Sequence, residues 1–94
     1  MAPLWPRARR KSDLSEHVNR QAAEKLVQQV STWYSQQIIA ERRAPAPDAQ
    51  RLKHLTDLLA ACAADRQALE DAEADEIDAI AARYAARAKE FEGQ

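Results

Sequence analysis

Glycine and proline, the residues that most often interrupt helices, are almost absent from the middle of this chain. The one glycine is Gly93, and the four prolines are Pro3, Pro6, Pro45 and Pro47. Between residues 12 and 92, only the segment 44–47 therefore contains a strong helix breaker. No stretch alternates apolar and polar residues for the length of a strand, so a sheet is not expected. The scarcity of breakers predicts an all-α protein.

Cysteine and long apolar runs are also scarce. Cys62 is the only cysteine, so no disulfide can form within the chain. The sequence has no run of about 18 apolar residues, which argues against a transmembrane helix. Residues 1–11 place their charges after their apolar residues and lack the apolar stretch of a secretory signal. We therefore expect a cytoplasmic location and no contact with a membrane.

Side chains that bind metals or perform catalysis are few and poorly spaced. Neither His17 nor His54 follows a glutamate by three residues, as a di-metal helical bundle requires. One cysteine and two distant histidines do not make a zinc site. The acidic run 70–78 imitates the start of a calcium loop, but Glu76 and Ala82 stand where that loop needs glycine and glutamate. We expect no metal, no cofactor and no enzymatic activity.

A first helix is predicted over residues 13–43. Asp13 and Glu16 form a capping box at its start, and Pro45 stops it. Its apolar positions recur at helical spacing. They are Leu14, Val18, Ala22, Leu26, Val30 and Trp33, with Val27, Tyr34, Ile38 and Ile39 beside them. Residues 1–11 are expected to form a flexible basic tail, because Pro3 and Pro6 disfavour a helix there.

A second helix is predicted over residues 48–92, with an apolar stripe that changes register part-way. The first part of the stripe is Leu52, Leu55, Leu59, Cys62, Arg66 and Leu69, and the second is Ile77, Ile80, Tyr84, Ala88 and Phe91. The segment between them has no large side chain and no glycine or proline. We expect one continuous helix with a stutter near residue 73. The alternative is a break near residues 70–75, followed by a third helix that folds back.

The apolar stripes are wide, which bears on the oligomeric state. Adjacent apolar pairs occur at Leu26–Val27, Trp33–Tyr34, Ile38–Ile39 and Leu58–Leu59. Each helix thus has more apolar surface than one partner helix covers. We expect residues 12–94 to form an antiparallel helical hairpin that dimerises, coiled-coil fashion, into a four-helix bundle. A three-helix bundle within one chain is the alternative. The candidate protein interface consists of Trp33, Tyr34, Ile38, Leu58, Ile77, Ile80, Tyr84 and Phe91.

Charge is divided unevenly between the two predicted arms. Residues 1–43 carry eight Lys and Arg against four Asp and Glu, whereas residues 44–94 carry six against eleven. Arms of opposite charge favour antiparallel pairing, within the chain or between chains. The candidate residues for nucleic-acid contact are Arg7, Arg9, Arg10 and Lys11. Basic arms of this kind bind phosphates without reading the base sequence.

These observations favour a non-catalytic protein–protein interaction module. Such a module would be a helical scaffold, adaptor or inhibitor that acts as a homodimer and binds a further protein. The alternative hypothesis is a nucleic-acid-associated accessory or regulatory factor that uses residues 7–11.

Overall fold

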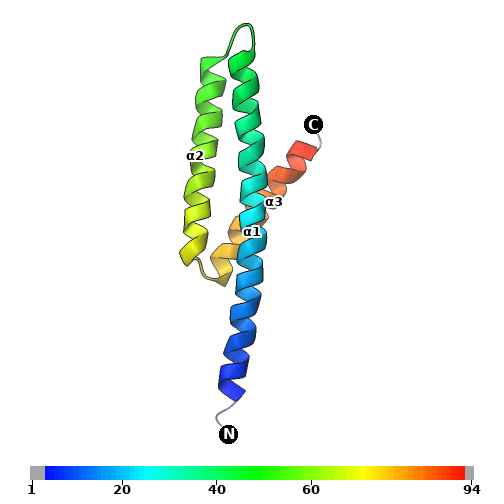
Figure 1. Cartoon of the computed structure of the whole chain (residues 1–94), viewed down its shortest axis with the longest axis vertical. Coiled ribbons are helices and arrows are strands. Elements are labelled where there is room, and N and C mark those ends of the chain that lie inside the picture. The colour runs from blue at the N-terminus through cyan, green and yellow to red at the C-terminus, as the bar shows by residue number, and fades with distance from the viewer. Residues whose placement is uncertain (1–3, 93–94) are drawn as a thin grey trace.

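Three helices and no strand make up the described part of the chain (Figure 1). The computed structural model describes the backbone of residues 4–92 and the side chains of residues 15–92. The helices are α1 (Leu4–Arg43), α2 (Ala49–Asp71) and α3 (Ala74–Glu92). Helix α1 packs against both α2 and α3, which contact each other little. The all-α fold is therefore confirmed, in the three-helix form.

Helix α1 is the axis around which the other two helices are arranged. Helix α2 runs antiparallel beside its C-terminal half, while α3 turns back and crosses α1 at an angle (Figure 1). The N-terminal turns of α1 project beyond both, and the molecule measures 71 × 24 × 15 Å. The core therefore lies along only part of the longest helix.

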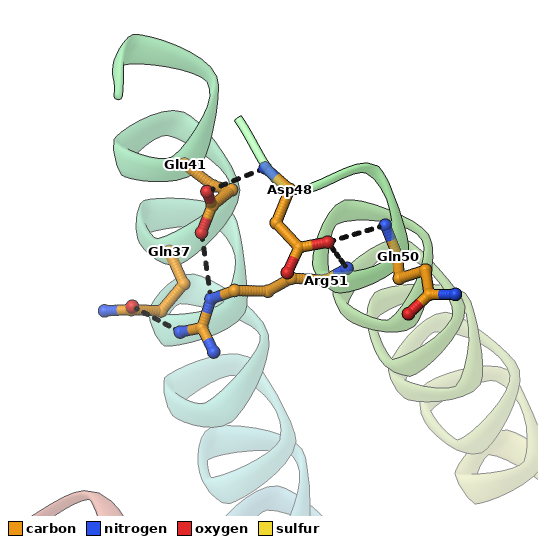
Figure 2. A network of polar contacts seen from close by, with 5 residues as sticks. All are labelled: Gln37, Glu41, Asp48, Gln50 and Arg51. Carbon is orange, nitrogen blue, oxygen red and sulfur yellow. Dashed lines mark hydrogen bonds and ion pairs between the residues drawn. The ribbon is translucent and has the colours of Figure 1, made fainter. Parts of the chain in front are cut away.

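The Ala-Pro-Ala-Pro segment at residues 44–47 ends α1 and reverses the chain, as predicted. Asp48 is the N-cap of α2, where its carboxylate accepts hydrogen bonds from the backbone N–H groups of Gln50 and Arg51 at 3.0 and 3.2 Å. Glu41 accepts from the backbone N–H of Asp48 at 3.1 Å and pairs with Arg51 at 3.0 Å (Figure 2). The cap contributes about 1 kcal/mol, and the partly exposed ion pair contributes less.

The first helix begins at Leu4 and not at residue 13, which corrects the predicted non-helical tail over residues 4–11. Pro6 lies in the first turn, where backbone N–H groups have no acceptor within the helix and the fixed φ of proline is helical. Proline is therefore compatible with this position, although it would break a helix further along. The side chains of residues 4–14 and all of residues 1–3 lie outside the described structure.

The second predicted helix is interrupted at residues 72–73, within the range given for the alternative. Ala72 is extended, with φ −70° and ψ 144°, and α3 starts where the N–H of Ile77 donates to the carbonyl of Glu73 at 2.9 Å. The break lets Ile77 and Ile80 pack in the core, where a straight helix would expose them to water. The continuous helix is thus corrected to two helices.

The core follows helical spacing on all three helices. The buried residues are Ala23, Val27, Val30, Tyr34 and Ile38 on α1, Leu55, Cys62 and Leu69 on α2, Ala72 between the helices, and Ile77, Ile80, Tyr84 and Ala88 on α3. These positions confirm much of the apolar stripes predicted for residues 52–69 and 77–91. On α1 the buried line differs from the predicted one. Val18 is 61% exposed, because it lies about 140° around the helix from buried Ala23.

Two adjacent isoleucines at the C-terminal end of α1 test this packing. Ile38 is 7% exposed and Ile39 is 48% exposed. Ile38→Ala should lower the free energy of unfolding by about 2–5 kcal/mol, because it leaves a cavity. Ile39→Ala, the matched control, should change it by less than about 0.5 kcal/mol. Urea unfolding followed by circular dichroism measures both. Equal losses for the two variants would contradict the orientation of α1.

Candidate functional site

An arginine of α1 caps the C-terminal end of α2. Arg20 donates from Nε to the carbonyl of Leu69 at 2.7 Å and from Nη2 to the carbonyl of Ala72 at 2.8 Å. In an uninterrupted helix, these two carbonyls would accept from the N–H groups of Glu73 and Glu76. Arg20 therefore replaces the two backbone donors that the break removes. Its positive charge also suits the negative end of the helix dipole.

The predicted site residues do not include Arg20, although its position carries a signal. It lies three residues before Ala23, on the line that continues through buried Val27 and Val30. A charged residue on an apolar line needs a polar partner in the interior. The sequence alone does not say which carbonyls supply that partner, because they lie about fifty residues further along the chain.

Aromatic side chains fasten the last turn of α3 to α1. The rings of Trp33 and Phe91 are stacked, with centroids 3.9 Å apart and planes 5° from parallel. Tyr34 meets the edge of Phe91 at 5.6 Å and that of Trp33 at 5.8 Å. Each such pair contributes about 0.5–1.5 kcal/mol to stability, beyond the contribution from burying its apolar area. Trp33 and Phe91 remain partly open to a shallow groove of about 280 Å³ between α1 and α3.

Polar side chains link α2 and α3 directly. The hydroxyl of Tyr84 donates to Asp65 Oδ2 at 2.5 Å, and Arg83 lies 3.7 Å from the other carboxylate oxygen. The guanidinium of Arg87 lies 5.0 Å from the centre of the Tyr84 ring. Burial, and then the hydrogen bond to Asp65, raise the pKa of Tyr84 well above its usual 10.0. Tyr84 is therefore a neutral hydrogen-bond donor at physiological pH, not a base.

The nucleophilic side chain of the core is also protonated at neutral pH. Burial raises the pKa of the Cys62 thiol above its usual 9.0. Cys62 lines a groove of about 500 Å³ between α1 and α2, whose other lining residues are Val27, Ser31, Leu59, Ala63, Arg66, Gln67 and Glu70. The one carboxylate of this lining, Glu70, is exposed, and among the described residues it makes no hydrogen bond to the thiol or to Ser31. Ser31 instead donates its hydroxyl to the backbone carbonyl of Gln28 at 3.0 Å.

The eight predicted interface residues all lie in or against the core of the single chain. Five of them are buried, namely Tyr34, Ile38, Ile77, Ile80 and Tyr84. The other three, Trp33, Leu58 and Phe91, are partly buried against that core. Contacts within the chain thus account for their burial, and a role between chains stays a prediction. So does nucleic-acid contact by Arg7, Arg9, Arg10 and Lys11, whose side chains lie outside the described part.

Comparison with protein-family models, curated proteins and solved structures finds no match to this chain. Among the residues that the structure describes, no three His, Cys, Asp or Glu side chains are placed to hold a metal ion. Over the same residues, no helix combines the length and apolarity needed to cross a membrane. A function for this chain is therefore inferred from its own surfaces.

The ionisation of Tyr84 gives a test of its contact with Asp65. Because the pKa of Tyr84 is higher in the folded than in the unfolded chain, the free energy of unfolding should fall as pH rises above about 10. Tyr84→Phe should remove that part of the pH dependence and cost about 1 kcal/mol at pH 7. Urea unfolding at pH 7 and near pH 11 measures both effects. An unchanged pH dependence in the variant would contradict the raised pKa.

Proposed function

We propose that this chain is a non-catalytic protein–protein interaction module that acts as a homodimer. The observation that carries the proposal is the projection of α1, whose N-terminal turns extend beyond α2 and α3 (Figure 1). On the last turn before α1 meets the α2–α3 corner, Val18 is 61% exposed. Most of the stability of helices in proteins comes from tertiary packing, and these N-terminal turns have neither α2 nor α3 beside them (Figure 1). A second molecule supplies a surface for that packing.

Charge supports a second copy of the same chain as the partner. Residues 1–43, which include α1, carry net positive charge, and residues 44–94 carry net negative charge. In an antiparallel two-fold dimer, the basic helix of each copy lies beside the acidic arm of the other. The elongated shape, 71 Å by 24 Å, favours such side-by-side pairing, because it buries the most surface along the long axis. Two chains paired in this way form a helical bundle.

Two exposed apolar residues of α1, Val18 and Ile39, form a matched pair for testing the dimer. Val18→Glu should raise the dimer dissociation constant by about tenfold or more, because it places a charge at the base of the projecting turns. Ile39→Glu, near the C-terminal end of the helix, should leave it unchanged. Sedimentation velocity over a concentration series measures both. A wild-type chain that stays monomeric throughout would contradict the homodimer.

A nucleic-acid-associated role is the second candidate, favoured by the helical backbone of residues 4–11 at the projecting end. Arg7, Arg9, Arg10 and Lys11 changed together to Gln should weaken binding to DNA or RNA by about tenfold or more and reduce its salt dependence. The control changes Arg42 and Arg43, at the other end of α1, to Gln. Fluorescence anisotropy at two salt concentrations is the measurement. Equal affinity of both variants for the nucleic acid would exclude this role for residues 7–11.

A further inference from the structure

The corner between α2 and α3 is held by distant contacts and not by its own residues. Residues 70–76 are glutamate, aspartate and alanine, which are all tolerated inside helices. Ala72 is nevertheless extended, and the carbonyls of Leu69 and Ala72 take their hydrogen bonds from Arg20. Local sequence thus favours a straight helix across the corner, and tertiary contacts favour the bend. Residues 72–73 have the properties of a hinge.

A straightened hinge matches the length of α1. Helix α1 has 40 residues and is about 60 Å long, and a helix over residues 49–92 would be about 66 Å long. In the bent form, the N-terminal turns of α1 have neither helix beside them (Figure 1). In the straightened form, α3 continues in the direction of α2 and runs along those turns. The projection of α1 is therefore the surface that an extended arm would cover.

Straightening moves α3 away from the α1 of its own chain. The α1 of an antiparallel second copy offers α3 the same packing surface and points in the same general direction as α3. Within one chain α3 crosses α1 at an angle but points in the same general direction, since its start lies near Arg20 and its last turn stacks on Trp33 (Figure 1). An extended α3 runs antiparallel to its own α1. The α1 of an antiparallel partner runs the other way and is therefore parallel to that α3. The contacts between α1 and α3 can form between copies in the same sense as within one.

We propose that the surface of α1 that holds α3 is a dimer interface, and that its partner is the α3 helix of a second copy. The inference rests on the proposed homodimer and names how it forms. The hinge at Ala72–Glu73 straightens, and the two copies exchange α3, as in domain swapping. The exchanged and bent forms share the core contacts of α3, including the stack of Trp33 on Phe91. They differ at the hinge, where Arg20 holds the carbonyls in the bent form only.

Proline at the hinge should block the exchange without harming the bent form. Glu73→Pro removes an N–H that a straight helix needs, and the extended Ala72 already has the conformation that precedes proline. The dimer dissociation constant should rise by about 100-fold or more. Glu73→Ala removes the same carboxylate and leaves the helix permitted, so it should not weaken the dimer. Circular dichroism and sedimentation velocity measure folding and mass.

Removing the cap should act in the opposite direction. Arg20→Ala leaves the two carbonyls without their donors in the bent form, whereas the straight helix supplies backbone donors. The fraction of dimer at a given concentration should rise. Lys25→Ala, which removes an exposed charge of the same helix, should have no such effect. A dimer that responds equally to both variants would contradict the role of Arg20.

Cross-linking distinguishes exchanged from unexchanged dimers. Thr32 on α1 and Glu92 on α3 are exposed beside the same groove. Cysteines at both positions, in a Cys62→Ala chain, are joined by a short bismaleimide after dimer and monomer fractions are separated. Exchange predicts covalent dimers on a denaturing gel from the dimer fraction and single chains from the monomer fraction.

Single chains alone from the dimer fraction, or a dimer that Glu73→Pro does not weaken, overturn the exchange and leave the homodimer standing. A chain that is monomeric at every concentration, with Arg20→Ala included, overturns both proposals.

Discussion

The fold depends on two hydrogen bonds that one arginine makes across the molecule. Helix α2 can end where it does because Arg20 satisfies the carbonyls of Leu69 and Ala72. Hydrogen bonds from a charged donor are worth about 1.5–3 kcal/mol each, and an unsatisfied buried carbonyl would cost a similar amount. If α2 did not end there, α3 could not turn back, and Ile77, Ile80 and Tyr84 would leave the core. A contact between the middle of α1 and the C-terminal end of α2 thus determines the topology of the chain.

The packing of this small domain depends on α1. Helices α2 and α3 both pack on it and barely touch each other, so their relative position depends on α1 and on the polar link from Tyr84 to Asp65. In that link the phenol donates and the carboxylate accepts, and burial raises the pKa of the phenol further above its usual 10.0. A chain of this size buries a limited apolar area, and its margin of stability is correspondingly small. Single contacts at the helix ends therefore carry more weight than they would in a larger domain.

Local rules predict those parts of this fold that local chemistry decides. The turn at residues 44–47 follows from two prolines and the capping aspartate Asp48, and the spacing of apolar residues locates most of the buried stripes. The same rules misplace the start of α1, because the cost of Pro6 depends on its position in the helix. They also favour an unbroken second helix, because Ala72 and its neighbours form helices readily. Local rules do not predict the hydrogen bonds of Arg20, since their acceptors are remote in sequence.

The conflict between local preference and tertiary contact at residues 72–73 connects the fold to the proposed assembly. A bend made by proline would be fixed by the backbone and would resist straightening, because proline lacks the N–H that a straight helix needs. A bend made of helix-forming residues has a competing straight form. The bend is stable only while the hydrogen bonds of Arg20 and the packing of α3 on α1 contribute more free energy than the helical hydrogen bonds that the straight segment would make. When a second copy offers the same packing surface, the contacts of α3 are equally available in the bent and the exchanged form. The equilibrium between the two forms then depends on Arg20, on the hinge and on protein concentration, because mass action favours the dimer at high concentration.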